Sequence, residues 1–177
     1  MAHAPGSMSR PPLAIVIPAR NEAARLPGLL AQLASAPRLI REVVVVDGDS
    51  EDATARVARL AGAQVLQARA NRGQQLALGV AASSAPWLLL LHADACLPAG
   101  WDKSLQRAMS CGDHLVWAFR LAIDGGHPAL RLVELAVQLR SRWRQLPYGD
   151  QGLLLSRRRL EAAGGVRPLP LMEDLDL

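Results

Sequence analysis

Aromatic side chains and lysine are both scarce in this chain of 177 residues. Aromatic residues make up 3% of the sequence and hydrophobic residues 50%, so the core must be built from Leu, Val, Ile and Ala. Lys103 is the only lysine among 20 Lys and Arg residues, and the formal net charge is +4. Nucleic-acid-binding proteins usually cluster their basic charge and place aromatic residues among it. Neither pattern occurs here, which argues against a nucleic-acid partner.

Cysteine patterns typical of metal or redox sites are also absent. Cys96 and Cys111 follow no such spacing, and we expect both to be reduced and partly buried. No stretch approaches the roughly 18 uninterrupted apolar residues of a membrane-spanning helix. The opening "MAHAPGSMSRPP" lacks the apolar run of a signal peptide. We therefore predict a cytoplasmic protein without a transmembrane segment.

Two common phosphate-binding motifs are missing as well. No G-x-G-x-x-G follows the first apolar run, and no G-x-x-x-x-G-K-[ST] occurs anywhere in the chain. These absences argue against a dinucleotide-dependent dehydrogenase and against a P-loop enzyme.

Short apolar runs alternate with longer amphipathic stretches in the first two thirds of the chain. Apolar runs separated by helices are typical of buried parallel strands in an α/β protein. We expect strands at residues 13–17, 42–47, 63–67 and 87–92, and helices at 22–35, 52–60, 74–83 and 100–109.

The sequence pattern changes after Leu115. "LVWAFRLAI" alternates like a strand with one solvent-exposed face, and Leu130 to Arg144 predicts a long amphipathic helix. "GLLLS" predicts a strand followed by a short helix that stops at Gly164. We predict a disordered tail at 1–12 and one domain at 13–177, with a nucleotide-sugar half (13–112) and an acceptor half (113–177). Contact of Arg157 to Arg159 with an anionic membrane surface is open, although a solvated helix start also explains them.

Three of the expected strands end in polar residues, namely "PARNE", "DGDSEDAT" and "HAD". Ligands of open parallel sheets bind beyond the carboxyl ends of the strands. Asp94, which follows four leucines, is therefore expected at the rim of a polar crevice. Acids together with the Arg72-Gly73 turn suggest a divalent cation, Mn²⁺ or Mg²⁺, that bridges an anionic diphosphate.

Six segments, in order, resemble glycosyltransferase family 2, the inverting enzymes of GT-A fold. They are "IPARNE", "VVVVDGDSEDAT", "NRGQQLALG", "LLLLHADACLP", "YGDQGLLLSRR" and "GGVRPLPLMEDLDL". The chain looks similar to the bacterial branch in which His-Ala-Asp replaces the Asp-x-Asp metal motif. The resemblance implies an α/β fold whose Rossmann-like half has a mostly parallel central sheet, with a smaller acceptor half.

The resemblance implies a nucleotide site at the first two strand ends. Pro18 and Ala19 would offer backbone groups to the base, with Glu22 nearby as an acceptor for base or ribose. Asp47 would accept from the imide N–H of a uracil or the matching edge of another base, which favours UDP- or GDP-linked donors.

Several residues of these loops have alternative explanations. Asn21 belongs to the same nucleotide stretch but would also suit a cap for the next helix, whose dipole Glu22 would favour. Ser50 is expected to cap the second helix. Asp49 departs from the usual order of the motif, so its role stays open.

The diphosphate and metal segments follow by the same resemblance. Arg72 would neutralise phosphate, and Gly73 would let the backbone approach it, although both also fit an ordinary helix start. Asp94 would bind the cation. His92 could ligate a metal, contact ribose or be an ordinary strand-end histidine.

The catalytic base implied by the resemblance is Asp174, with Glu173 as the second choice, although both would suit an acidic helix N-terminus. The acceptor side is assigned to the "YGDQG" loop, whose polar members are Tyr148, Asp150 and Gln151. The chain ends soon after this motif, which suggests a C-terminally shortened domain.

Two rival functions remain open from the sequence. One is a protein that binds nucleotide sugars without turnover, because a fold alone does not establish activity. The other is a haloacid-dehalogenase-like phosphatase, whose Asp-x-Asp pattern "VVVVDGDS" imitates, although here it follows the second strand. The sugar, the base and the acceptor are not encoded in any motif that we can identify.

Overall fold

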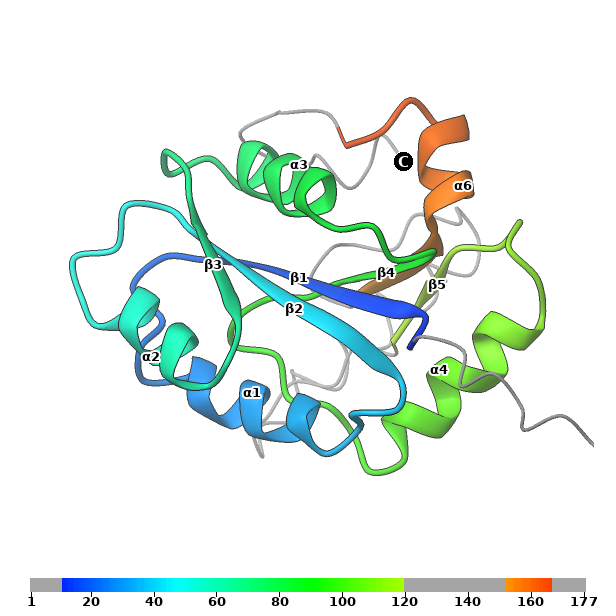
Figure 1. Ribbon diagram of the computed structural model, residues 1–177, viewed down its shortest axis with the longest axis horizontal. Coiled ribbons are helices and arrows are strands. Elements are labelled where there is room, and N and C mark those ends of the chain that lie inside the picture. The colour runs from blue at the N-terminus through cyan, green and yellow to red at the C-terminus, as the bar shows by residue number, and fades with distance from the viewer. Residues whose placement is uncertain (1–10, 120–151, 167–177) are drawn as a thin grey trace, which may run out of the picture.

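The computed structural model describes residues 11–119 and 152–166, which form a sheet covered by helices on both faces (Figure 1). The strands of this part are β1 (Leu13–Ala19), β2 (Ile40–Asp47), β3 (Gln64–Gln67), β4 (Trp87–Leu90), β5 (Trp117–Ala118) and β6 (Leu153–Ser156). Their order across the sheet is β3-β2-β1-β4-β6-β5. The neighbours β3, β2, β1 and β4 are parallel, whereas β6 is antiparallel to both β4 and β5.

The helices divide between the two faces of the sheet. They are α1 (Leu26–Ala34), α2 (Thr54–Leu60), α3 (Arg72–Ala82), α4 (Trp101–Ser110) and α6 (Arg157–Ala162). Helices α1, α2 and α4 cover one face, and α3 and α6 cover the other (Figure 1). This arrangement explains why the central strands are apolar on both sides, as the sequence pattern predicts for buried parallel strands.

Alternate residues of β1 belong to two separate apolar cores. Leu13, Ile15 and Ile17 pack in the core that contains the leucines of α1 and Trp101 of α4. Ala14 and Val16 belong to the smaller core formed with α3 and α6. The period of two along the strand therefore joins both helical layers to the sheet.

The predicted elements that lie within the described residues are confirmed, with shifted boundaries. Helix α1 begins at Leu26 instead of at Glu22, because residues 23–25 form a turn in which the Ala23 amide donates to the Asp52 side chain. Cys96 and Cys111 are free, as predicted, but both are exposed, so the expected partial burial is wrong. The helix predicted at 130–144 and residues 1–10 of the tail predicted at 1–12 lie outside the described residues.

The three arginines at the start of α6 differ in their surroundings. The Arg157 guanidinium turns inward and donates to the carbonyls of Ser83, Ala85 and Val80, at 2.8, 3.0 and 3.3 Å. Arg158 and Arg159 are exposed. Within the part of the chain that the structure describes, no helix is both long and apolar enough to cross a membrane.

Gly79 allows α3 to pack directly against β1 and β2. A Cβ atom at this position would overlap a methyl group of Val16 and would lie 3.0 Å from a methyl group of Val46. Both valines are fully buried in the centre of the sheet and cannot move aside easily. The absence of a side chain therefore sets the distance between this helix and the sheet.

We predict that Gly79→Ala lowers the free energy of unfolding by about 1–3 kcal/mol, because overpacking displaces the helix or the valines. Urea unfolding followed by circular dichroism measures the change. Gly28→Ala is the matched control, because Gly28 also lies in a helix but has nothing within 4 Å of the added Cβ. The control should be stabilising, by up to about 1 kcal/mol. Equal effects of the two substitutions would contradict this account of the packing.

Candidate functional site

The carboxyl ends of the parallel strands meet at one edge of the sheet. Ala19, the last residue of β1, pairs with Asp47, the last of β2, and Asp47 pairs with Gln67 of β3. Strand β4 leaves the sheet earlier, and its continuation is held by the Leu91 amide, which donates to the Val16 carbonyl at 3.0 Å. The segments "RNE", "GDSED" and "HAD" therefore start from the same edge, as predicted from the sequence.

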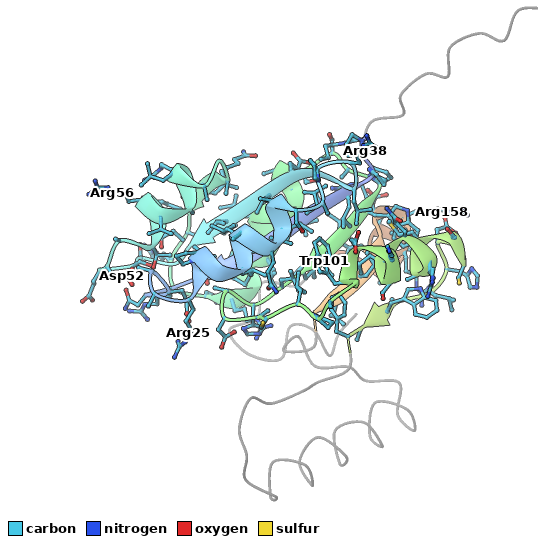
Figure 2. The ribbon with its side chains drawn as sticks, turned by 90° about the horizontal axis from the view of Figure 1, so that it is seen from below. Arg25, Arg38, Asp52, Arg56, Trp101 and Arg158 are labelled. Carbon is cyan, nitrogen blue, oxygen red and sulfur yellow. The ribbon has the colours of Figure 1, made fainter. Side chains whose placement is uncertain are left out.

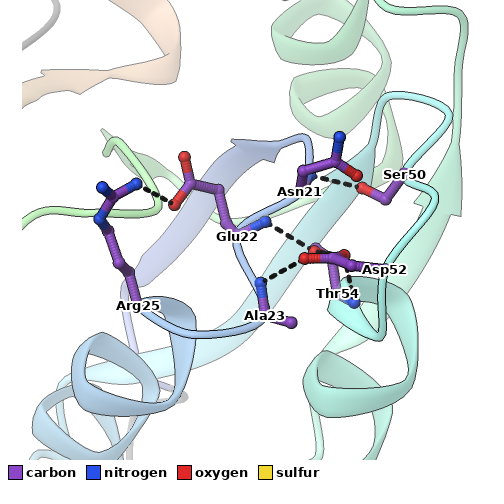
Figure 3. A network of polar contacts seen from close by, with 7 residues as sticks. All are labelled: Asn21, Glu22, Ala23, Arg25, Ser50, Asp52 and Thr54. Carbon is purple, nitrogen blue, oxygen red and sulfur yellow. Dashed lines mark hydrogen bonds and ion pairs between the residues drawn. The ribbon is translucent and has the colours of Figure 1, made fainter.

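The loops that follow β1 and β2 are joined by hydrogen bonds in both directions, and Figure 3 shows those that the first loop donates to the second. The Asn21 amide donates to Ser50 Oγ at 2.9 Å, and the Glu51 amide donates to Asn21 Oδ1 at 2.8 Å. Asn21 and Asp49 both have positive φ angles, of 54° and 56°. Asn and Asp tolerate this backbone region better than most side chains, which explains why they occupy these turns.

A second pair of contacts continues the same junction. The amides of Glu22 and Ala23 donate to Thr54 Oγ1 and Asp52 Oδ2, at 2.8 and 3.1 Å. The Thr54 side chain is fully buried, and its hydroxyl also donates to Asp52. Four backbone amides of the two loops thus find side-chain acceptors on the opposite loop. The junction holds the backbone of the "PARNE" segment in one conformation.

The pKa of Asp52 is lowered, first by the hydrogen bond from the Thr54 hydroxyl and then by backbone amides, with desolvation opposing them. A carboxyl group whose pKa is lower in the folded state stabilises that state above its ordinary value, near 3.8. This contribution is lost as the pH falls through the folded-state pKa. The junction between the two loops therefore weakens in acid below the ordinary pKa of aspartate.

These contacts correct two expectations about helix caps. Asn21 does not cap the next helix, because α1 has Arg25 at its N-cap position, without a side-chain capping bond. Ser50 does not cap α2, whose N-cap position is held by Ala53. Both side chains instead accept hydrogen bonds from the backbone of the opposite loop. Glu22 lies part-buried and forms an ion pair with Arg25 at 3.3 Å. Figure 2 shows Arg25 and Asp52 toward the same end of the molecule, with Arg158 toward the opposite end.

Asp47 is a buried carboxylate at the end of β2, only 3% exposed. Its Oδ2 atom accepts a long hydrogen bond of 3.4 Å from the Ser50 amide. Its Oδ1 atom has no hydrogen-bond partner among the described residues. A buried carboxylate oxygen without a donor is unfavourable by an amount of order 1–3 kcal/mol or more. Such an atom is the feature expected where a ligand supplies the missing N–H or O–H group.

Gln75 supports the same strand ends from α3. Its side-chain amide donates to the carbonyls of Val46 and Ala19, at 2.7 and 3.2 Å. The residue is 5% exposed, so both bonds lie in the interior. Gly48 lies directly against it, and a Cβ there would be 2.8 Å from Gln75 Nε2. A side chain at the glycine of the "DGDSEDAT" segment would therefore displace the Gln75 amide from its present position.

Helix α3 begins at the segment predicted to lie over a diphosphate. Asn71 caps it by accepting from the Gln74 amide at 3.0 Å. Arg72 and Gly73 occupy its first turn, Arg72 half-buried and Gly73 buried. An ordinary helix start is thus confirmed, and it is compatible with anion binding, because the free amides of a helix N-terminus attract negative charge.

The loop after β4 carries the predicted metal motif. Asp94 is exposed in a turn, between the buried residues Ala93 and Leu97, and His92 is half-buried. We find no hydrogen bond or ion pair to the Asp94 carboxylate within the described residues. Carboxylate oxygen suits Mn²⁺ and Mg²⁺, so a free exposed carboxylate at the strand end fits the cation that the sequence predicts.

The described residues alone do not build a complete metal site. Among residues 11–119 and 152–166, no group of three or more His, Cys, Asp or Glu side chains could hold a metal ion. A cation at Asp94 would therefore need further oxygen ligands, for which the phosphates of a bound nucleotide are suitable. The predicted residues on the acceptor and catalytic side, Tyr148, Asp150, Gln151, Glu173 and Asp174, lie outside the described residues.

A hollow of about 300 Å³ lies between α4 and strands β5 and β6. Its lining is mainly apolar and includes Leu105, Trp117, Phe119 and Leu154, with no carboxylate. Such a lining does not suit a nucleoside diphosphate or a cation. The polar strand ends, and not this hollow, are therefore the candidate nucleotide site.

Sequence analysis did not find two residues that support this site. Gln75 lies 29 and 56 positions from the carbonyls that it binds, and Gln32 of α1 lies 65 positions from Leu97, its partner in the loop after β4. Both glutamines are placed on helices where a polar residue is unremarkable. No local pattern could have revealed contacts at such separations, which depend on how the helices pack.

We predict that Thr54→Val lowers the free energy of unfolding by about 1–3 kcal/mol, because it leaves the Glu22 amide without its acceptor. Thr54→Ser keeps the hydroxyl and should be less destabilising. Urea unfolding of both variants measures the difference. A valine variant as stable as the serine variant would show that the hydroxyl contributes little to the junction.

Comparison with known proteins identifies the family of this chain. The family model described as Glycosyl transferase family 2 matches residues 14–161. Uncharacterised glycosyltransferases of Mycobacterium tuberculosis and Mycobacterium bovis are 33% identical over 141 residues, which cover 77% of this chain and 62% of the relatives. The chain thus spans less than two thirds of the length of these relatives. The 4,4'-diaponeurosporenoate glycosyltransferase of Staphylococcus haemolyticus is 47% identical over 53 residues, 30% of this chain and 14% of that protein.

Solved structures show the same fold. Glucosyl-3-phosphoglycerate synthase from Mycobacterium tuberculosis, crystallised with Mn²⁺, UDP-glucose and phosphoglyceric acid, is similar with a TM-score of 0.65 at 22% identity. The similarity covers 88% of this chain and 63% of that one. The mostly parallel six-stranded sheet of the described residues is that of the GT-A glycosyltransferases. From the match over residues 14–161, the chain belongs to glycosyltransferase family 2.

Proposed function

We propose that this chain transfers a sugar from a nucleotide sugar to an acceptor hydroxyl, with inversion at the anomeric carbon and with the help of Mn²⁺ or Mg²⁺. The observation that carries the proposal is the buried Asp47 carboxylate, whose Oδ1 atom has no partner among the described residues. It lies at the strand edge that also bears the free carboxylate of Asp94. Family membership supports a glycosyltransferase, and the similar synthase is crystallised with Mn²⁺ and UDP-glucose.

The base of the nucleotide is the proposed partner of Asp47. The imide N–H of uracil, or the N–H of the matching edge of guanine, would satisfy the free Oδ1 atom. Pro18 and Ala19 end the neighbouring strand and would offer backbone groups, with Glu22 at the ribose side. Asn21 holds this backbone in place through its bonds to the second loop, and Asp49 lies exposed in that loop.

The diphosphate is proposed to lie between the start of α3 and the loop after β4. Arg72 would neutralise phosphate charge, and the buried Gly73 would let the backbone approach it. Asp94 would hold the divalent cation, and His92 would line the same side. When bound, the cation neutralises the charge that develops on the leaving diphosphate.

The transfer step needs a base on the acceptor side, for which we propose Asp174, with Glu173 as the second choice. The carboxylate would take the proton of the acceptor hydroxyl as its oxygen attacks the anomeric carbon. The bond from that carbon to the diphosphate oxygen breaks on the opposite side, and the nucleoside diphosphate leaves. Tyr148, Asp150 and Gln151 are proposed to contact the acceptor.

The two rival functions no longer have equal support. Membership of glycosyltransferase family 2 removes the support for a haloacid-dehalogenase-like phosphatase. Binding of a nucleotide sugar without turnover is distinguished from transfer by the activity test below.

Cytoplasmic location stays a prediction. For contact with a membrane surface, Arg158 and Arg159 are exposed, whereas Arg157 is engaged with backbone carbonyls.

We predict that UDP and GDP bind more tightly than ADP, because adenine lacks a ring N–H at the edge that Asp47 would contact. Isothermal titration with each nucleotide in the presence of Mn²⁺ measures the order. Asp47→Asn should weaken UDP or GDP about 10–100-fold, the size of a charge-assisted hydrogen bond of about 1.5–3 kcal/mol. Glu51→Gln, in the same loop and with the same change of charge, is the control. Equal affinity for ADP would show that Asp47 does not contact the base.

We predict that Asp174→Asn lowers sugar transfer or donor hydrolysis by about 10²–10⁴-fold, while donor affinity stays the same. The donor is first chosen by a thermal-shift screen of UDP-, GDP-, ADP- and TDP-sugars with and without Mn²⁺, because ligands of the native state raise its unfolding temperature. Full turnover of this variant would move the assignment to Glu173. Donor binding without any turnover by the unmodified chain would favour the binding protein.

A further inference from the structure

The Gln32 side chain of α1 holds the loop that carries Asp94. Gln32 Nε2 donates to the Leu97 carbonyl at 2.9 Å, and the Leu97 amide donates to Gln32 Oε1 at 2.9 Å. The same Nε2 atom lies 3.9 Å from Cys96 Sγ. The amide group therefore binds one residue of the loop through both its donor and its acceptor, in the way that a neighbouring strand would.

The loop is fixed mainly at its two ends. It lies between β4 and α4, and residues 92–97 belong to neither a helix nor a strand. Its start is fixed to the sheet by the Leu91 amide, and its turn is closed by the Ala95 amide, which donates to the His92 carbonyl at 3.2 Å. Its far end is fixed by the pair of bonds to Gln32 and by the buried side chain of Leu97. Asp94 lies exposed between these anchors.

The position of a carboxylate ligand affects metal affinity strongly. Residues that only orient a ligand typically change metal affinity or activity 10–100-fold when they are mutated. The Asp94 carboxylate has no hydrogen bond of its own within the described residues, so its position depends on the backbone that carries it. That backbone depends in turn on the anchors at the two ends of the loop.

We propose that Gln32 is a positioning residue for the cation-binding carboxylate of Asp94, a proposal that rests on the proposed function. A side-chain amide carries a donor and an acceptor side by side, so Gln32 donates to the Leu97 carbonyl and accepts from the Leu97 amide at the same time. Glutamate lacks the donor, and leucine or methionine lacks both groups. Helix α1, which the reaction does not otherwise use, thereby sets the geometry of the metal side of the site.

The test separates metal affinity from folding stability in the full chain. Mn²⁺ is titrated into protein saturated with UDP, or with GDP if that nucleotide binds more tightly, and free Mn²⁺ is followed by its electron paramagnetic resonance signal. Nucleotide affinity without metal is measured by calorimetry in EDTA. The variants are Gln32→Leu, Asp94→Ala and the control Leu33→Val, which removes one buried methylene from the same helix.

Gln32→Leu should weaken Mn²⁺ binding about tenfold or more and leave metal-free nucleotide affinity unchanged. Asp94→Ala should abolish Mn²⁺ binding at this site. Leu33→Val should lower the unfolding midpoint without changing Mn²⁺ affinity, because it leaves both bonds to Leu97 intact. This pattern cannot arise from a loss of stability alone.

A folded Gln32→Leu variant with the Mn²⁺ affinity of the unmodified chain would overturn the proposal. If that variant does not fold, Gln32→Met, which is flexible and lacks both hydrogen-bonding groups, is judged by the same criterion. Retention of Mn²⁺ binding by Asp94→Ala would overturn the positioning role while leaving the donor function in place. Absence of nucleotide-dependent Mn²⁺ binding in the unmodified chain would overturn the proposed metal-assisted function itself.

Discussion

Strand β1 lies between β2 and β4 and is parallel to both, and this pairing places every other part of the site. Parallel strands end at the same edge of a sheet, so three segments that are distant in the chain leave the sheet together. The register is specified by burial, because β1 is apolar on both faces and a shift of one residue would exchange the side chains of the two cores. The polar loops can have irregular backbones because the regular strands before them fix where each loop begins.

Neutral amide side chains connect the helices to this edge. Gln75 bridges the carbonyls at the ends of β1 and β2 from one layer, and Gln32 holds the loop after β4 from the other. An amide can satisfy a backbone carbonyl without bringing a charge into the interior, where an unpaired charge is far more costly than a dipole. Among the charged groups at this edge, Asp47 and Asp94 thereby keep carboxylate oxygens available for ligands.

The buried Asp47 carboxylate shows how function and stability are opposed at this edge. Its Oδ2 atom receives one long bond from the Ser50 amide, and its Oδ1 atom receives none from the described residues. An apolar residue would be the more stable choice at the end of a buried strand. Retaining a partly satisfied carboxylate there is understandable if a ligand completes its hydrogen bonds, which is the basis for assigning the base of the nucleotide to it.

The sequence by itself determined the alternation of strands and helices, the polar strand ends and the family, because these depend on local apolar periodicity and on short motifs. It also predicted the edge at which Asp47 and Asp94 lie, since parallel strands leave no other arrangement. It wrongly predicted Ser50 as a helix cap and offered the same role as an alternative for Asn21, because a capping residue and a residue that binds a neighbouring loop have the same local sequence pattern. The roles of Gln32, Gln75 and Gly79 were decided only by the tertiary structure, since each depends on contacts with residues that are distant in the chain and that packing alone brings within reach.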